Sequence, residues 1–327
     1  SIEARQFCGF KRVPNKSQFT RFKKNFHNHL HNFFNSLVLK TESICRKLGE
    51  NFASHVIIDT SGILPNVKEN NDKYLFSIVK SLKKIYKDKS EEDLYKIAYN
   101  KMNKTASADD RIRLMYINGS FNYAYKFSII TNAHGIVRNI SFVDNDFIQK
   151  HNEVKNHILN SSNEQEKSVS DSIILKPTLN DFFDIFKNTD YSFHTFLGDS
   201  AFDKFDNYPM LLKDFKFKRA LIPTNPRNTN NSKEGDHIYI NKDGIPVCST
   251  HNLPFKSEGT CKGKNRSLRR KFVCPNSNRY YKNKKIVCDK NCSDSINGRN
   301  IYTYNEQDLR INPGISRATE HFKKVYK

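Results

Sequence analysis

The fold of this chain is decided by two short apolar stretches that each end at an aspartate. The first is His55-Val56-Ile57-Ile58-Asp59-Thr60-Ser61-Gly62, and the second is Phe193-His194-Thr195-Phe196-Leu197-Gly198-Asp199-Ser200-Ala201-Phe202-Asp203. In both, β-branched, aromatic or aliphatic residues stop at an acid followed by small turn-forming residues, which predicts a buried strand that ends in a carboxylate. Open α/β sheets usually keep their sites at that edge. The alternative is that each aspartate only caps the turn or helix that follows.

The net charge of the chain restricts its partners. The 327 residues include 55 Lys and Arg against 34 Asp and Glu, a formal net charge of +21. This excess attracts polyanions, and we expect a nucleic acid instead of a membrane surface because no amphipathic basic helix with a large apolar face stands out. The alternative is a general Lys- and Asn-rich bias of the source, which would not decide where basic residues cluster.

The basic residues cluster in two segments. Residues 256–290 hold 12 basic and two acidic residues, and residues 1–50 hold ten and three. These segments are the candidate DNA-contacting surfaces. No apolar run approaches the ~20 residues that a membrane-spanning helix needs, and no secretory signal is visible at the start. We therefore expect a cytoplasmic protein without membrane contacts.

The order of elements predicts an α/β fold. Residues 1–50 are expected to be helical after the turn and cap Pro14-Asn15-Lys16-Ser17, with an apolar stripe in the core. The stripe comprises Phe19, Phe22, Phe26, Leu30, Phe33 and Phe34. After the Asp59 strand come two helices at 71–87 and 90–103, a hairpin with strands 123–130 and 136–143, and a helix to residue 187 whose start is marked by Lys176-Pro177-Thr178. The Asp199 strand, a helix at 204–215 and a strand at 219–223 follow.

This order is compatible with a ribonuclease H-like mixed sheet flanked by helices, with a helical N-terminal region and a Cys-rich, strand-containing insertion. We expect a helical N-terminal region at 1–50, the catalytic core at 51–225, the basic Cys-rich insertion at 226–300, and a return to the core with the start of the last helix at 301–327.

Three groups of residues resemble the DDE transposases of bacterial insertion sequences. They are Ile57-Ile58-Asp59-Thr60-Ser61-Gly62, Tyr123-Ala124-Tyr125-Lys126, and Leu197-Gly198-Asp199-Ser200-Ala201-Phe202-Asp203. The opening Arg5-Gln6-Phe7-Cys8-Gly9-Phe10, together with Pro14-Asn15-Lys16-Ser17-Gln18-Phe19, resembles the helical N-terminal domain of the same transposases. The resemblance covers most of the chain, discontinuously.

The resemblance implies a metal-dependent site. Mg²⁺ takes oxygen ligands and is usually held by one or two carboxylates plus substrate phosphate, and a pair of such ions suits in-line displacement at phosphorus. By resemblance, Asp59 bridges two Mg²⁺ or Mn²⁺ ions and Asp199 holds one of them. The resemblance also implies a homodimer on double-stranded DNA, because two element ends must be brought together, and a place at the bacterial nucleoid.

The third acid departs from the family pattern. In the resembling transposases it belongs to a signature Tyr-x-x-Arg-x-x-x-Glu-x-x-x-x-x-x-Lys on a late helix. One placement uses Glu320 and Lys327, but puts Ser316 and Pro313 where Arg and Tyr belong. The other begins at Tyr326, so that the glutamate lies beyond Lys327. We prefer the second placement, because Pro313-Gly314 is unfavourable inside a helix.

The cysteines suggest a second metal. Five of the seven lie between residues 248 and 292, and without a signal peptide this predicts a metal site or reduced thiols instead of a disulfide framework. The preferred structural Zn²⁺ site is Cys248, Cys274, Cys288 and Cys292, with Cys261 or His251 as substitutes. Unliganded thiols are the alternative, because the spacings match no standard finger.

The leading hypothesis is therefore a DDE-type transposase that binds mobile-element ends, cleaves them and joins the freed 3′-hydroxyl to target DNA. The alternatives are a metal-dependent nuclease of the same fold and a catalytically dead DNA-binding remnant. Asp203 is expected only to cap the helix that follows it.

Overall fold

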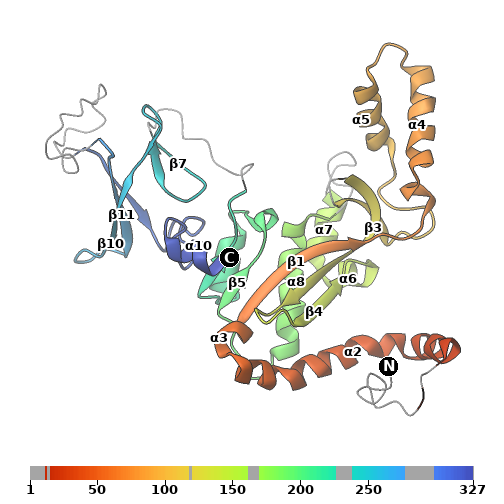
Figure 1. Ribbon diagram of the computed structural model, residues 1–327, viewed down its shortest axis with the longest axis horizontal. Coiled ribbons are helices and arrows are strands. Elements are labelled where there is room, and N and C mark those ends of the chain that lie inside the picture. The colour runs from red at the N-terminus through yellow and green to blue at the C-terminus, as the bar shows by residue number, and fades with distance from the viewer. Residues whose placement is uncertain are drawn as a thin grey trace.

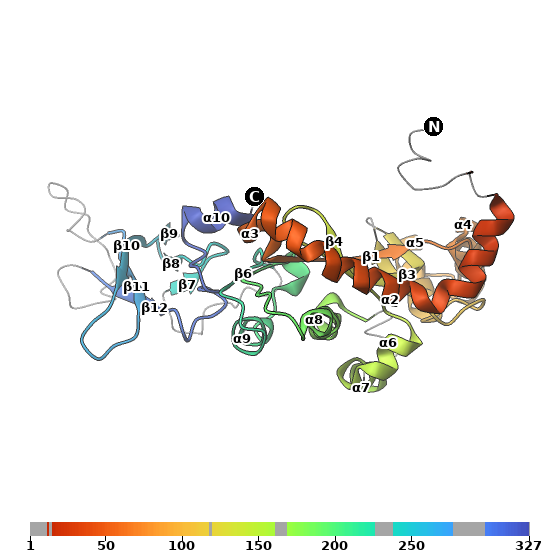
Figure 2. The ribbon, with the colours of Figure 1, turned by 90° about the horizontal axis from the view of Figure 1, so that it is seen from below.

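The computed structural model describes Arg12 and residues 15–117, 120–160, 169–225, 238–276 and 298–326. The chain has a mixed α/β architecture in which helices flank a central mixed sheet, as predicted (Figure 1). The molecule is elongated, with two small sheets at one end and the helical hairpin of α4 and α5 at the other (Figure 2).

The central sheet has six strands. They are β1 (His55–Ile63), β2 (Ile112–Ile117), β3 (Ser120–Thr131), β4 (Val137–Phe142), β5 (Thr195–Leu197) and β6 (Arg219–Leu221). The order is β2-β3-β1-β5-β6, and β4 also pairs with β3. β5 lies parallel to β1 and β6 parallel to β5, whereas β3 is antiparallel to β1, β2 and β4. The predicted β3–β4 hairpin is confirmed, and its turn uses Gly135 at φ 75°.

β1 differs from the prediction because it continues four residues past Asp59. Its pairing with β5 ends at Ile57–Leu197, but its pairing with the long strand β3 runs on to Ile63–Tyr125. The backbone of β1 beyond Asp59 therefore keeps its strand partner on one side only. Asp59 lies where the parallel half of the sheet has ended and the antiparallel half continues.

One face of the sheet is covered by helices. α8 (Asp171–Phe186) provides Leu175, Leu179 and Phe182 to the main core. From the sheet, Val56, Ile58, Phe196 and Ala220 enter the same core. α8 begins at Asp171, five residues before the expected start at Lys176, because Ile174 and Leu175 are buried in the core. Pro177 therefore lies inside the helix. The short α9 (Asn207–Pro209) and a π-helical turn at Met210–Asp214 complete this layer.

Helix α2 (Lys16–Leu48) runs along the same side of the sheet (Figure 2). Its Asn15 forms the predicted N-cap, as a capping box with Gln18. Val38, Glu42 and Cys45 are buried, and Arg138 of β4 donates to Glu42 and to the Val38 carbonyl. A short helix, α3 (Glu50–Ala53), joins α2 to β1.

The prediction that the aromatic stripe of α2 lies in the core is wrong for five of its six residues. Phe34 packs against the core. The others are 40–68 % exposed, namely Phe19, Phe22, Phe26, Leu30 and Phe33. Helical periodicity identifies an apolar face but not what covers it. α2 carries two such faces, and only the face with Val38 and Cys45 meets the core.

The two helices between β1 and β2 are confirmed. α4 (Asp72–Ile85) and α5 (Glu91–Lys101) pack through Val79, Leu82 and Leu94, and Ser90 caps α5. A 3₁₀ turn at Lys68–Asn70 precedes α4. Between β4 and α8 lie α6 (Asn145–Lys150) and α7 (Asn152–Asn160).

The insertion holds two three-stranded sheets. One contains β7 (Ile238–Ile240), β8 (Pro246–Cys248) and β9 (Leu253–Pro254), and the other contains β10 (Lys256–Cys261), β11 (Arg269–Val273) and β12 (Asn300–Tyr304). Because β12 pairs with β11, the second sheet extends to Tyr304, past the expected boundary at residue 300.

A return segment, residues 305–319, leads from the insertion back to the core. It passes along the free edge of β6, where the Ala220 N–H donates to the Pro313 carbonyl at 2.9 Å. Gly314 has φ 80°, and a Cβ placed there would lie 1.9 Å from the Lys218 carbonyl oxygen. The last helix, α10 (Glu320–Tyr326), follows. In the described ranges, no helix combines the length and apolar character needed to cross a membrane.

Candidate active site

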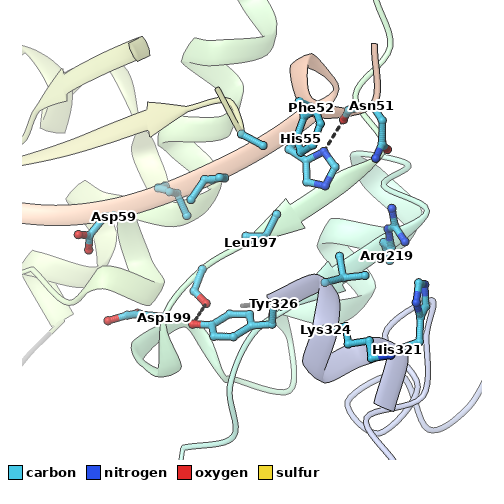
Figure 3. Close-up of a pocket in the computed structure, with 15 residues that line it drawn as sticks. Asn51, Phe52, His55, Asp59, Leu197, Asp199, Arg219, His321, Lys324 and Tyr326 are labelled. Atoms are coloured by element: carbon cyan, nitrogen blue, oxygen red, sulfur yellow. Dashed lines mark hydrogen bonds between the residues drawn. The ribbon is translucent and has the colours of Figure 1, made fainter. Parts of the chain in front are cut away.

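Asp59 and Asp199 lie at the same depth of the sheet, Asp59 on β1 and Asp199 in the turn that follows β5. Each stands two residues beyond the last β1–β5 pair, Ile57–Leu197. Side chains alternate between the two faces of a strand, so Asp59 shares its face with Ile57 and His55, opposite to the core residues Val56 and Ile58. The structure thus brings the two predicted carboxylates to one cavity (Figure 3).

The turn that follows β5 positions the Asp199 carboxylate. Its Oδ1 accepts the Ala201 N–H at 3.0 Å and so caps a 3₁₀ turn at Ser200–Phe202. Burial raises the pKa of Asp199, and the charges of Asp171 and Asp59 raise it further. Asp59 is exposed, and its Oδ1 accepts the Thr60 N–H at 2.8 Å. The two acids thus repel each other electrostatically across an accessible space.

The cavity has a volume of about 900 Å³ and two chemically different ends. Asp59 and Asp199 lie at one end, while Arg219, His321 and Lys324 lie toward the other (Figure 3). Between them, Ile57 and Leu197 form an apolar floor. The carboxylates at one end suit a divalent cation, and the Arg219 guanidinium and Lys324 ammonium at the other end suit an anion.

The basic end of the cavity is formed partly by the three parallel strands β1, β5 and β6. His55, Thr195 and Arg219 are register partners across β1, β5 and β6, four residues before the two aspartates. At a strand rise of about 3.3 Å per residue, the two rows are separated by roughly 13 Å. Arg219 Nε donates to Thr195 Oγ1 at 2.8 Å. Burial lowers the pKa of His55, and the Arg219 charge acts in the same direction, so His55 is neutral near pH 7.

Helix α10 closes one side of the cavity. Tyr326 lies beside Asp199, and its hydroxyl is 3.5 Å from the Gly198 carbonyl oxygen (Figure 3). Burial raises the pKa of Tyr326, and the charge of Asp199 adds to this. Glu320, the fallback third acid, is exposed at the start of α10 and pairs with Lys323 at 3.3 Å. His321, Lys324 and Tyr326 line the cavity, whereas Glu320 does not.

The donor set fits Mg²⁺ or Mn²⁺. Two carboxylates in one cavity, with room beside them, match the usual one or two carboxylates plus substrate oxygens. A cation between Asp59 and Asp199 would relieve the repulsion that raises the Asp199 pKa. Among the described residues, no group of three or more His, Cys, Asp or Glu side chains is placed to hold a metal.

Sequence reasoning missed a buried ion pair near the site. Lys126 on β3 is 5 % exposed, and its Nζ lies 2.7 Å from Oδ1 of Asp171, the first residue of α8. The sequence did contain one signal of this pair: Lys126 lies within a predicted strand rich in aromatic and aliphatic residues, and a buried lysine needs a partner. The identity of that partner, 45 positions along the chain, had no local signal.

Asp203 is not the simple helix cap that the sequence suggested. It is fully buried, and it accepts from Arg310 through both carboxylate oxygens, at 3.0 and 2.7 Å. Tyr208 donates at 2.5 Å, the Asn225 N–H at 2.6 Å, and Arg317 lies 3.4 Å away. This cluster fastens the return segment to the turn that follows Asp199.

The predicted zinc ligands are only partly described. Cys248 and Cys274 both pack in the apolar cluster around Phe272, where the two small sheets meet. Cys288 and Cys292 lie outside the described residues. Cys261, one of the substitutes, is on β10 opposite Arg269.

The predicted basic surfaces are described in part. On β11, Arg270 donates to Ser257 and Lys271 pairs with Glu258 at 2.7 Å, so both side chains have intramolecular partners. Lys262, Lys264 and Arg266 belong to the loop between β10 and β11, and all three are exposed. This loop therefore presents three basic side chains to solvent.

No protein-family model matches the sequence, and the searches of curated proteins and of solved structures gave no match.

Proposed function

We propose that this chain is a DNA transposase of the DDE class with a ribonuclease H-like catalytic core. It would bind mobile-element ends, cleave a strand at each end with a divalent metal, and join the freed 3′-hydroxyl to target DNA. The observation that carries the proposal is the convergence on one cavity of Asp59, on β1, and Asp199, in the turn that follows the parallel strand β5.

The topology supports a ribonuclease H-like core. The chain order is the Asp59 strand β1, helices α4 and α5, antiparallel strands β2 to β4, helices α6 to α8, strand β5 leading to Asp199, short helical turns and the final strand β6. In space, β1, β5 and β6 are parallel neighbours, while β3 lies antiparallel on the other side of β1 and pairs in turn with β2 and β4. Fold alone does not imply chemistry, so the proposed function depends on the carboxylates.

The residues of the cavity have separable roles in this proposal. Asp59 and Asp199 would hold Mg²⁺ or Mn²⁺, which when bound supplies Lewis-acid chemistry for phosphoryl transfer. Arg219 and Lys324 would bind backbone phosphates of the DNA strand at the other end of the cavity. Neutral His55 adds no charge of its own.

The position of Tyr326 supports the second placement of the family signature. Its side chain faces the Asp199 turn from α10. Helical residues separated by seven positions share a face, so a glutamate seven positions beyond Tyr326 on a continued helix would face the same cavity. We therefore place the third acid beyond Lys327 and not at Glu320.

The deciding experiment is cleavage of a supercoiled plasmid carrying the element ends, with Mg²⁺ or Mn²⁺. The intact reading frame is compared with its Asp59→Ala, Asp199→Ala and Glu320→Gln variants. We expect both aspartate variants to lose cleavage and strand joining, and Glu320→Gln to retain them. Cleavage without joining would favour a nuclease, and end binding without cleavage would favour a DNA-binding remnant.

A homodimer on DNA is part of the same proposal, because two ends must be joined in one reaction. Light scattering of the protein with end DNA checks it, and two protein copies per pair of ends is the expected stoichiometry.

A further inference from the structure

The sheet alone does not hold the Asp199 carboxylate in place. The pairing of β5 with β1 ends at Leu197, and Asp199 lies in the turn beyond. The sheet contact nearest to it is the Gly198 N–H, which donates to the Leu221 carbonyl at 3.1 Å. Something on the other side of the turn must fix its distance from Asp59.

That support comes from the first turn of α8. Ser172 Oγ donates to the Ala201 carbonyl at 2.9 Å, and the Ala201 N–H in turn donates to Asp199 Oδ1 at 3.0 Å. Phe202, at the end of the same turn, is buried in the core with Leu175 of α8. The start of α8 is thus the base on which the Asp199 turn rests.

Lys126 fastens the start of α8 to the sheet. Its ammonium lies 2.7 Å from Asp171 Oδ1, and it donates to the Val169 carbonyl just before the helix. Two residues along β3, Ser128 bonds Thr178 of α8 at 2.9 Å, and both side chains are fully buried. β3 therefore holds α8 at two points, of which Lys126 is the one next to the Asp199 turn.

β3 also pairs with β1, the strand that contains Asp59. β3 pairs with β1 from Ile57 to Ile63, and Lys126 is the register partner of Gly62, three residues beyond Asp59. The path from Lys126 through Asp171, Ser172 and Ala201 therefore links the strand beside Asp59 to the carboxylate of Asp199.

We propose that Lys126 and Asp171 are positioning residues that fix Asp199 relative to Asp59 for metal binding. The inference deepens the proposed function and rests on it, since it concerns the same metal site. Partners that orient metal ligands without touching the metal commonly change metal affinity by about 10–100-fold when they are removed.

Charge and position predict opposite results for Lys126. Removing a positive charge near a cation site should by electrostatics alone tighten Mn²⁺ binding. Loss of the Lys126–Asp171 ion pair should weaken Mn²⁺ binding, because the Asp199 turn is no longer held at its distance from Asp59. The direction of the change therefore distinguishes a positioning role from a charge effect.

The experiment is Mn²⁺ binding, followed by electron paramagnetic resonance, to the wild type and to Lys126→Met, Lys126→Arg, Asp171→Asn and Ser172→Ala. We expect Lys126→Met and Asp171→Asn to weaken binding about tenfold. Ser172→Ala, which removes a single hydroxyl, should weaken it by a smaller factor. Lys126→Arg, which keeps the charge, should bind more tightly than Lys126→Met.

The matched control is Glu42→Gln. Glu42 and Arg138 form another buried ion pair, between α2 and β4, away from the cavity. Its loss should lower the thermal midpoint without changing Mn²⁺ affinity, which separates lost positioning from general destabilisation. Circular dichroism confirms the folding of each variant, and Ser172→Ala remains decisive should Lys126→Met fail to fold.

Unchanged or tighter Mn²⁺ binding by folded Lys126→Met, or unchanged binding by Ser172→Ala, would overturn the inference while leaving the metal site intact. If Asp199→Asn also binds Mn²⁺ like the wild type, the metal site itself is wrong and this inference is lost with it. The two failures are therefore distinguishable.

Discussion

Asp59 on β1 and Asp199 in the turn after β5 each lie two residues past the last pair that joins these adjacent parallel strands. Their side chains face a common cavity, and the charge of Asp59 raises the electrostatic cost of ionising Asp199. Such an arrangement is unfavourable for the empty protein and favourable for one that binds a divalent cation.

The first prediction is that Asp199→Asn stabilises the metal-free protein at pH 7. Burial, Asp171 and Asp59 raise the pKa of Asp199 in the folded state. The folded protein therefore binds this proton more strongly than the unfolded chain, and stability falls as pH rises from the ordinary Asp pKa of about 3.9 through the raised value. Urea unfolding with EDTA measures it.

The amide introduced by Asp199→Asn keeps an oxygen for the Ala201 N–H, so the comparison isolates the charge. Adding Mn²⁺ should reverse the order, because a ligand that binds only the folded wild type stabilises it. A metal-free Asp199→Asn variant less stable than the wild type at pH 7 would contradict the prediction.

The second prediction concerns the buried Asp203. Burial alone would raise its pKa, but hydrogen bonds from Arg310, Tyr208 and the Asn225 N–H, with the charge of Arg317, lower it. Stability from this group is thus present above the unfolded Asp pKa and is lost as pH falls through the lowered value. Asp203→Asn should cost about 3–5 kcal/mol, because it removes the charge that buried arginine pairs with.

Urea unfolding at pH 7 checks this cost. The control is Asp206→Asn, three residues along the chain, whose side chain is 77 % exposed. Its effect should stay within about 0.5 kcal/mol. Similar losses in the two variants would show that the Asp203 cluster does not stabilise the fold.

The third prediction compares two glycines. Gly314 and Gly259 have φ of 80° and 85°, but a Cβ at Gly259 meets no atom within 4 Å, whereas one at Gly314 meets backbone atoms of Lys218 and Arg219. Gly259→Ala should cost about 1–2 kcal/mol, the penalty for the left-handed conformation. Gly314→Ala should cost clearly more, because the return segment must move away from β6.

Thermal unfolding of both variants provides the comparison. Because the two glycines have similar φ, the difference between the two losses isolates the close approach to β6. Equal losses of stability in the two variants would mean that moving the return segment away from β6 costs no measurable free energy.

The fourth prediction is that the loop between β10 and β11 binds DNA phosphates. Neutralising Lys262, Lys264 and Arg266 to Gln should reduce the slope of log K against log salt by about 0.9 for each phosphate that the loop no longer neutralises. Lys271→Gln is the matched control, since Lys271 already pairs with Glu258 at 2.7 Å.

Fluorescence anisotropy with a labelled duplex over a range of salt concentrations measures these slopes. A triple variant with the wild-type slope would assign the DNA surface to another part of the chain.

Much of the sheet could be predicted from local signals. Two apolar runs ending at Asp59 and Asp199, and a turn with Gly135 between alternating stretches, identify strands of the central sheet and two residues of the cavity. These signals are short-range: strand periodicity, turn chemistry and the position of an acid after an apolar run.

The remaining features depend on contacts between distant residues. Lys126 and Asp171 meet because α8 crosses β3, and Asp203 is buried because Arg310, 107 positions away, returns to it. A sequence in isolation shows that a lysine or an aspartate is unusual at such a place, but not which charge neutralises it. The exposed aromatic face of α2 escaped prediction for a related reason, since periodicity does not identify a partner surface.

The return segment along β6 has a consequence for the behaviour of the protein at high concentration. An open strand edge has unpaired N–H and C=O groups that can form hydrogen bonds with a strand of another molecule. Here the Pro313 carbonyl already accepts the Ala220 N–H, and proline has no N–H to offer outward in exchange. Intermolecular strand addition at this edge would first have to displace the return segment, which therefore protects β6 against sheet-mediated aggregation.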